Sequence, residues 1–116
     1  MCGICGFTWN DDGALDRMVD RLRHRGPDAR GVHRGEGVSL GHARLSILDL
    51  SPTGAQPMLD ESGRLALVYN GEIYNFQDLR ESLSQAGHHF FGTSDTEVIL
   101  RGYKEWGEDV FSRLNG

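Results

Sequence analysis

Cys2 is the residue with the clearest chemical potential, because it directly follows the initiator methionine in the run MCGICGF at residues 1–7. Removal of Met1 would leave Cys2 with a thiol and a free α-amine on the same residue. An α-amine has a pKa of about 7.7–8.0, which suits a base that must accept and then return a proton. Thiol nucleophiles are activated by such an adjacent base. The position therefore predicts a nucleophilic cysteine that carries its own general base.

The spacing Cys2-x-x-Cys5 leaves three other interpretations open. One is half of a zinc site, although a structural zinc needs four ligands and the chain has two cysteines and five histidines without an H-x₃₋₅-H pair. Another is a redox motif, although such motifs usually open a helix and this one lies in an apolar run interrupted by glycines. The third is a buried terminal strand, because free cysteine packs like a small hydrophobic residue.

Strand-like and helical patterns alternate along the first half of the chain, which indicates an α+β fold. Residues 2–9 predict a strand. Apolar residues then recur with helical spacing and predict an amphipathic helix that stops at residues 25–28: Leu15, Met18, Val19 and Leu22. A second strand is predicted over residues 38–47, and a loop over residues 51–60. The apolar run at residues 65–69 predicts a strand that is buried on both faces.

The second half of the chain is predicted to be mainly helical. Asn70-Gly71 predicts a tight turn after the apolar run. Asn75 is a candidate cap for a helix with one apolar face, formed by Phe76, Leu79, Leu83 and Ala86. Ser94 and Glu97 form a candidate capping box for a further helix, which carries Val98, Ile99, Tyr103 and Trp106.

Length and composition limit the classes of protein to which the chain can belong. Its 116 residues make at most one domain, and a net charge of −5 gives no support for binding nucleic acid or an anionic membrane. No apolar run approaches the roughly 20 residues of a membrane span, and no signal-peptide pattern opens the chain. Two cysteines fit a cytoplasmic protein. Asn115-Gly116 resemble the approach to another strand, so we expect the front part of a longer domain.

Five motifs in order resemble one known family. They are MCGICGF at 1–7, RHRGPD at 23–28, GHARLSI at 41–47, YNGEIYN at 69–75 and TSDTEV at 93–98. Together they resemble the glutaminase domain of class II glutamine amidotransferases, in particular the type found in glutamine-hydrolysing asparagine synthetases. The loop GAQPM at 54–58 also favours this branch. The resemblance covers essentially the whole chain.

The resemblance implies which residues bind glutamine. Arg44 stands where the family binds the α-carboxylate, and its planar guanidinium suits a bidentate contact. Asp95 stands where the family binds the α-ammonium group, and Glu72 matches a position that helps to hold the same group. Without the resemblance, Arg44 would be interpreted as a solvated strand arginine. Asp95 would be an ordinary acid in the first turn of a helix.

Asn70 and Gly71 match the oxyanion hole of the family. Attack on an amide creates a negatively charged oxygen, and fixed N–H donors must already point toward it. The alternative interpretation of Asn-Gly is a hairpin turn, and both interpretations can hold together. Residues 25–28 resemble the family's loop beside the nucleophile, and we expect no catalytic role for them.

The implied activity is hydrolysis of glutamine to glutamate and ammonia through a thioester on Cys2. In the family, ammonia passes to a synthetase domain that uses ATP and magnesium to amidate aspartate. Residues 1–116 contain no glycine-rich phosphate motif, so we expect that domain elsewhere in a full-length protein.

The expected fold of residues 1–116 is therefore the first part of an αββα N-terminal-nucleophile sandwich. It is an incomplete type-2 amidotransferase domain with no metal or cofactor of its own. Glutamine and the synthetase domain are the expected partners, and the resemblance is compatible with a homodimer of the full-length protein.

Two other functions compete with this one. The chain could use the same cysteine on a different amide, but the pairing of Arg44 with Asp95 favours an α-amino acid as substrate. It could also be a truncated, non-catalytic fragment that keeps the motifs, in which case we expect Met1 to be retained.

Overall fold

The computed structural model describes residues 1–46 and 51–116, which form two compact units. Within the described residues, the first unit contains 1–46 and 55–70, and the second contains 51–54 and 71–116. The chain mixes helices with antiparallel strands, as the predicted α+β class requires. The finer prediction of an αββα sandwich stays a prediction.

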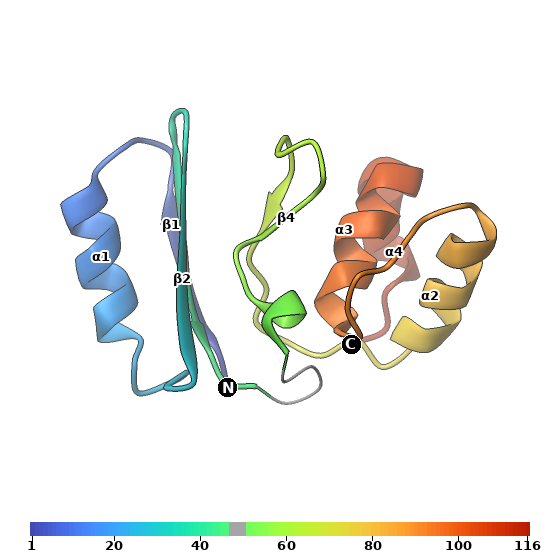
Figure 1. Ribbon diagram of the computed structural model, residues 1–116, viewed down its shortest axis with the longest axis horizontal. Coiled ribbons are helices and arrows are strands. Elements are labelled where there is room, and N and C mark those ends of the chain that lie inside the picture. Colours follow the sequence, from blue (N-terminus) through green and yellow to red (C-terminus); the bar gives the residue numbers. More distant parts are fainter. Residues whose placement is uncertain (47–50) are drawn as a thin grey trace. The chain divides into compact units, whose positions relative to one another are not determined.

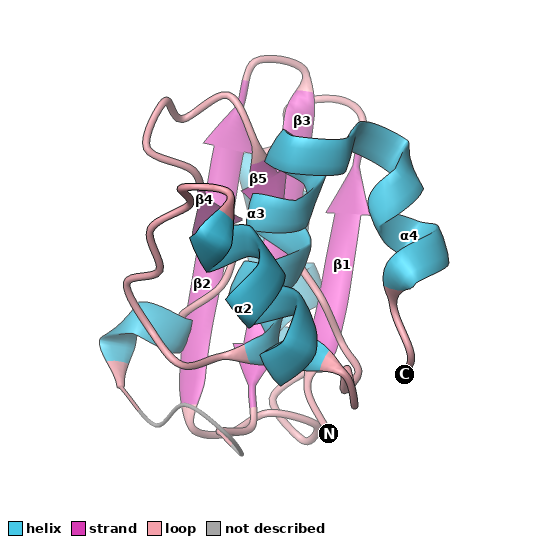
Figure 2. Cartoon of the chain, turned by 90° about the vertical axis from the view of Figure 1, so that its right-hand side faces the viewer, coloured by secondary structure: helices cyan, strands magenta, loops and turns pink. Residues whose placement is uncertain are grey.

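The first unit is built on a three-stranded antiparallel sheet with the order β1-β3-β2 (Figures 1 and 2). A short antiparallel pair, β4 with β5, belongs to the same unit. The register places Gly3 opposite Ala43 and Gly31 opposite His42. The elements are β1 (Gly3–Phe7), α1 (Asp12–Arg21), β2 (Ala29–Gly35), β3 (Val38–Arg44), β4 (Met58–Leu59) and β5 (Ala66–Leu67).

Helix α1 covers one face of this sheet, and the segment that contains β4 and β5 lies against the other (Figure 1). The predicted apolar face of α1 is confirmed in part, because Leu15 and Val19 are buried whereas Met18 is exposed. Both buried side chains contact the sheet at Gly41, where a side chain would collide with them. Because side chains alternate along a strand, His42 and Arg44 of β3 lie on the face opposite α1.

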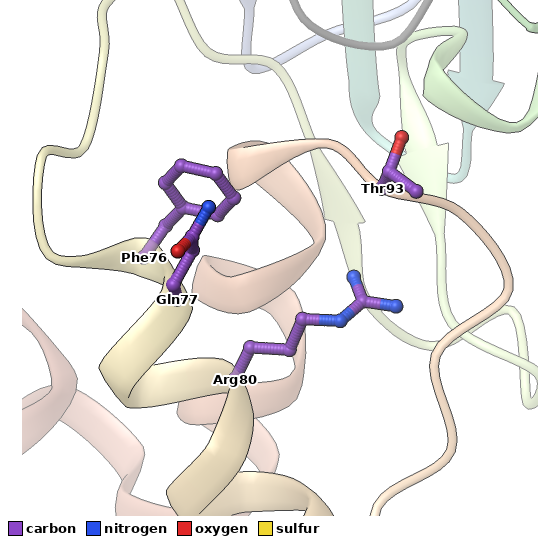
Figure 3. A pocket seen from close by; sticks show the side chains of 4 residues that line it. All are labelled: Phe76, Gln77, Arg80 and Thr93. Carbon is purple, nitrogen blue, oxygen red and sulfur yellow. The ribbon is translucent and has the colours of Figure 1, made fainter.

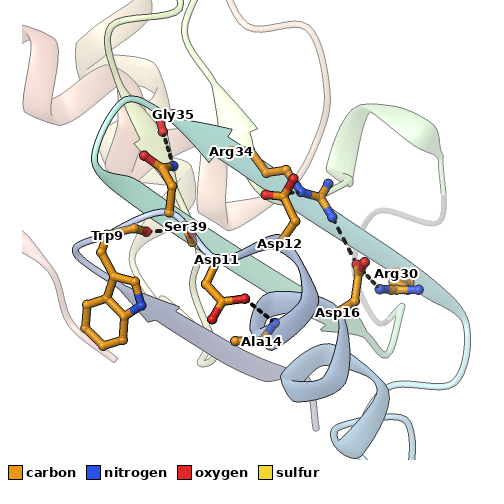
Figure 4. Close-up of polar contacts among 10 residues, drawn as sticks. Trp9, Asp11, Asp12, Ala14, Asp16, Arg30, Arg34, Gly35 and Ser39 are labelled. Atoms are coloured by element: carbon orange, nitrogen blue, oxygen red, sulfur yellow. Dashed lines mark hydrogen bonds and ion pairs between the residues drawn. The ribbon is translucent and has the colours of Figure 1, made fainter.

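Strand β2 was not predicted from the sequence. Its residues, Ala29–Gly35, contain a single large apolar residue, Val32, so they lack the alternation that marks a half-buried strand. The strand forms because β3 offers seven residues of pairing along its edge. Its two arginines, Arg30 and Arg34, make ion pairs with three aspartates on the facing side of α1: Asp12, Asp16 and Asp20. Figure 4 shows the pairs that involve Asp12 and Asp16.

Two strand predictions are corrected by the structure. The strand expected over residues 38–47 ends at Arg44, and Ile47 lies outside the described residues. The strand expected over residues 65–69 is reduced to Ala66–Leu67, and residues 65–69 are half-buried rather than buried on both faces. The physical reason is that β5 finds its strand partner in β4, which offers two residues for pairing.

The second unit is helical in its described residues. Its elements are the 3₁₀ turns η1 (Pro52–Gly54) and η2 (Gly107–Asp109) and the helices α2 (Phe76–Gln85), α3 (Asp95–Trp106) and α4 (Val110–Arg113). Helices α2 and α3 pack together through a core that includes Leu79, Leu83, Val98 and Ile99 (Figure 2). No helix of the described residues is both long enough and apolar enough to cross a membrane.

Asn75 occupies the predicted cap position of α2, but its side chain does not cap the helix. Its Nδ2 donates to the carbonyl oxygen of Arg113, and its Oδ1 accepts from the N–H of Asn115, each at 2.9 Å. The N–H of Tyr74 also donates to the Asn115 carbonyl oxygen, at 2.6 Å. The Asn75 amide therefore ties residues 113–115 to the start of α2 instead of capping it.

Core packing, rather than the ion pairs on α1, should dominate the stability of the first unit. Asp16 has a side chain that is 48% exposed, so Asp16→Ala should lower the free energy of unfolding by at most about 1 kcal/mol. Leu15→Ala should lower it by about 2–5 kcal/mol, because Leu15 is fully buried. Urea unfolding at low and at high salt would measure both, and the Asp16 effect should fade at high salt. Equal losses from the two variants would contradict this assignment.

Candidate active site

The six residues predicted to form the site fall into two sets, one in each unit. Cys2, Arg44 and Asn70 belong to the first unit. Gly71, Glu72 and Asp95 belong to the second.

Cys2 lies at the end of the three-stranded sheet, where its sulfur contacts the backbone of Leu45. The N–H of Leu45 donates to Cys2 Sγ at 3.3 Å, and the thiol reaches the Leu45 carbonyl oxygen at 3.5 Å. This contact follows from the register, because Gly3 pairs with Ala43 and therefore carries Cys2 to the residues that follow Arg44. Met1, which must be removed to free the Cys2 amine, is 64% exposed.

The loop at residues 25–28 supports both Cys2 and the end of β3. The Arg25 Nε donates to the carbonyl oxygen of Cys2 at 3.0 Å. The Asp28 N–H donates to the Arg44 carbonyl oxygen at 2.9 Å, and its Oδ2 accepts from the N–H of Ser46 at 2.8 Å. Gly26 is required because a side chain there would overlap the backbone of Ala43. The predicted place of this loop beside Cys2 is confirmed.

Arg44 is 9% exposed, which excludes the interpretation of a solvated strand arginine. It ends β3 on the sheet face opposite α1. The cation is thus held in a largely dry environment one residue before the backbone that contacts Cys2 Sγ. A guanidinium in such a place can bind a carboxylate through two parallel hydrogen bonds.

Cys5 is separated from Cys2 by the alternation of side chains along β1. Its sulfur faces α1, where it would lie 2.7 Å from a side-chain carbon placed on Gly41. Burial raises the pKa of the Cys5 thiol. In the part of the chain that the structure describes, no group of three or more His, Cys, Asp or Glu residues could hold a metal ion. The two cysteines are therefore placed as independent thiols.

Asp95 connects the start of α3 to the segment that carries Gly71 and Glu72. It is 6% exposed, and its Oδ2 accepts from the N–H of Ile73 at 2.9 Å. Gly71 and Glu72 themselves are exposed. The Asp95 carboxylate is thus buried and makes a specific backbone hydrogen bond. An acid that only interacted with the helix dipole would need neither.

Asn70 follows Tyr69, whose backbone is held by a side chain from another segment of the chain. The N–H of Tyr69 donates to Gln56 Oε1 at 2.6 Å, and Asn70 is half-buried. The chain bends at Gly71 and continues to α2, so among the described residues Asn70 and Gly71 do not close a hairpin.

Glu97 organises the loop that leads into α3. It is 2% exposed, and its two carboxylate oxygens accept from the N–H groups of Phe91 and Gly92, each at 2.9 Å. Arg101, one turn further along the helix, neutralises it at 3.3 Å. The predicted capping box is half correct: Ser94 Oγ accepts from the Glu97 N–H, but the Glu97 carboxylate bonds to the loop instead.

A pocket of about 380 Å³ lies in the second unit, lined by Phe76, Gln77 and Arg80 of α2 and by Thr93 (Figure 3). None of the six predicted site residues lines it. Arg80 donates to the Gly92 carbonyl oxygen at 2.7 Å and lies over the Phe90 ring.

His42 was missed as a candidate by the sequence analysis. It is 1% exposed, and neither ring nitrogen forms a hydrogen bond with the described residues. Burial lowers the pKa of His42; the nearby backbone of Tyr69 opposes this effect, and the charge of Arg44 adds to it. The available signal was its place in GHARLSI, two residues before Arg44 and therefore on the same sheet face.

Comparison with known proteins gives one family and a set of similar enzymes. A family described as "Glutamine amidotransferase domain" matches residues 1–116. The chain is 43% identical to asparagine synthetase [glutamine-hydrolyzing] 3 of Bacillus subtilis and 48% identical to a probable asparagine synthetase of Dictyostelium discoideum. It is also 43% identical to the amidase chry2 of Gibberella zeae. Each match covers 100% of this chain but only 20%, 22% and 20% of these relatives, respectively.

The lowered pKa of His42 predicts a loss of stability in mild acid. Above the unfolded value of about 6.5 the ring is neutral in both states. As the pH falls below that value, the unfolded chain binds the proton first, so the free energy of unfolding decreases. His42→Phe should remove this contribution, and urea unfolding between pH 8 and pH 5 would measure the difference. Parallel curves for the variant and the wild type would refute the prediction.

Proposed function

This chain belongs to the glutamine amidotransferase domain family, and we propose that it hydrolyses glutamine to glutamate and ammonia through a thioester on Cys2. The observation that carries the proposal is the environment of the Cys2 thiol. Its sulfur is held by the backbone of Leu45 directly after the buried Arg44. The proposed nucleophile and the proposed carboxylate-binding cation thus share one end of one sheet.

The proposed reaction begins when Met1 has been removed. The freed α-amine of Cys2 takes the thiol proton, directly or through a water molecule. The thiolate attacks the γ-carbonyl carbon of glutamine, and the carbonyl electron pair moves onto oxygen. When the tetrahedral intermediate collapses, the C–N bond breaks and ammonia leaves with the proton that the amine returns. Water then hydrolyses the γ-glutamyl thioester, which releases glutamate and restores the thiol.

The protein residues have separate roles in this proposal. Arg44 binds the α-carboxylate of glutamine, and Asp95 and Glu72 bind its α-ammonium group. The Asn70 side-chain amide and the Gly71 N–H donate to the oxyanion, an interaction that gains strength as charge develops in the transition state. Asp95 also supports Gly71 and Glu72 through its contact with the Ile73 N–H.

The fate of the ammonia follows from the relatives. We propose that it supplies the ATP-dependent conversion of aspartate to asparagine by a synthetase domain, because several relatives are named asparagine synthetases. The chain spans about a fifth of their length. The similarity to the amidase chry2 favours, as a second candidate, delivery of ammonia to another acceptor. Incubating the full-length protein with labelled glutamine, ATP, magnesium and aspartate would separate the two, since labelled asparagine forms only in the first case.

Cys2 should be essential for glutamine hydrolysis, and Cys5 should not. Cys2→Ala and Cys2→Ser should abolish glutamate release, because only Cys2 can lie beside a free terminal amine. Cys5→Ala should keep much of the activity, since that thiol faces α1 and burial raises its pKa. Glutamate release would be assayed alongside the intact mass of the protein. Equal losses from both changes would indicate a metal or redox pair, and retained Met1 without activity would support a non-catalytic fragment.

Arg44→Ala and Asp95→Asn should raise the KM for glutamine far more than they disturb the fold. Each removes one charge-assisted contact with the substrate, which should cost about 2–5 kcal/mol of binding. Asparagine at position 95 keeps an oxygen for the Ile73 N–H, so the backbone contact can survive the loss of charge. An analogue without the α-amine should bind the wild type more weakly than glutamine does. The Asp95→Asn variant should bind the analogue and glutamine with similar affinity. Normal glutamine affinity combined with a lower melting temperature would assign both residues a purely structural role.

A further inference from the structure

Gln56, Gly31 and His42 lie together in the first unit, next to the peptide that precedes Asn70. None of them is among the residues assigned above to the reaction. The three come from different parts of the chain: β2 provides Gly31, β3 provides His42, and the segment before β4 provides Gln56. Their convergence therefore results from the fold and not from a sequence motif.

The first contact is between the sheet and the segment that covers it. A side-chain carbon on Gly31 would overlap the carbonyl oxygen of Gln56, so the covering segment lies directly on the sheet at this glycine. From this position the Gln56 side chain extends to Tyr69, and its Oε1 accepts from the Tyr69 N–H at 2.6 Å. One glutamine thus anchors the end of the strand that leads to Asn70.

The second contact lies directly beside the first. Gly31 pairs with His42 in the sheet, and His42 lies on the face that the covering segment meets. Because Gln56 lies on Gly31 and binds the Tyr69 N–H, this arrangement brings the Tyr69 backbone to the same part of the sheet as His42. In agreement, the Tyr69 backbone opposes the lowering of the His42 pKa by burial. Both ring nitrogens of His42 lack a hydrogen-bond partner within the described residues.

We propose that Gln56 and His42 are positioning residues for glutamine hydrolysis, which together fix the Tyr69–Asn70 peptide and thereby the oxyanion donor on Asn70. The inference rests on the proposed function. Gln56 accepts from the N–H of Tyr69, and His42 is buried on the sheet face that the segment of Gln56 covers. Donors to an oxyanion act through preorganisation, so a small displacement of Asn70 weakens the transition state more than the bound substrate.

The burial of His42 is consistent with a role beyond packing. A buried imidazole without hydrogen bonds reduces stability, and an apolar ring of similar shape would avoid this cost. Departures from favourable packing of this kind concentrate at functional sites. The imidazole has a property that phenylalanine lacks, which is an N–H donor beside the segment that leads to Asn70.

Two variants of the full-length protein test the proposal, each with a matched control. His42→Phe is paired with His33→Phe, on the same sheet face of the edge strand β2, and Gln56→Leu is paired with Gln85→Leu on α2. We expect both test variants to lower kcat for glutaminase activity by about tenfold or more, because misplacement of about 1 Å can cost roughly a hundredfold. The KM should change far less, and both controls should behave as wild type.

Stability separates positioning from a structural role. At pH 8, His42→Phe should melt at or above the wild-type temperature while kcat falls. One of His42→Asn and His42→Gln should recover most of the lost kcat, because an amide can replace one imidazole N–H. Unchanged kcat in His42→Phe and Gln56→Leu would overturn the inference. So would a loss of kcat that only accompanies lower melting temperatures.

Amide hydrogen exchange gives a readout that does not depend on turnover. Gln56→Leu should speed exchange at Tyr69 by about tenfold or more, since it removes the acceptor of that N–H, and should leave α1 protected. Faster exchange throughout the chain would indicate unfolding and contradict the proposal. If the wild type releases no glutamate, the proposed function fails and the inference fails with it. If the wild type is active but the variants keep their kcat, the inference alone fails.

Discussion

The antiparallel pairing of β1 with β3 is the constraint on which the first unit depends. Because Gly3 lies opposite Ala43, the residue before Gly3 reaches the backbone that follows Arg44. A shift of the register by one residue would turn every side chain of β1 to the other face. It would reverse the faces of the two thiols, so that Cys2 faced α1 and Cys5 faced the opposite side of the sheet. The chemistry of Cys2 is therefore set by strand pairing as much as by its place behind Met1.

Two buried acids fix the loops of the second unit. Glu97 and Asp95 stand at the start of α3, where the helix dipole favours negative charge. Both also accept backbone N–H groups: Glu97 from the loop before the helix, and Asp95 from Ile73. These bonds compensate the cost of burying a carboxylate and give the loops a defined conformation. The Asp95 contact holds Ile73, directly after Gly71 and Glu72, so the segment that matches the family's site is supported by the helix that follows it.

Helices were predicted well from the sequence and strands less well, for identifiable reasons. The apolar spacing of Leu15 and Val19 predicted α1 because a helix buries one face whatever its partner is. Strand β2 escaped prediction because its residues carry no apolar alternation and depend on the free edge of β3. The cap expected from Asn75 failed for a similar reason, since residues 113–115, far along the chain, compete for the same amide.

Sequence alone determined the family, the candidate nucleophile and the set of residues expected to meet glutamine, because these depend on residue types in a fixed order. It also placed a helix stop at residues 25–28, although not the backbone of Ala43 that requires a glycine at position 26. Only the tertiary structure decided that Arg44 and His42 are buried and that Gln56 binds the N–H of Tyr69. These contacts join residues of different strands, and their distances follow from sheet register and packing, which no local pattern of residues encodes.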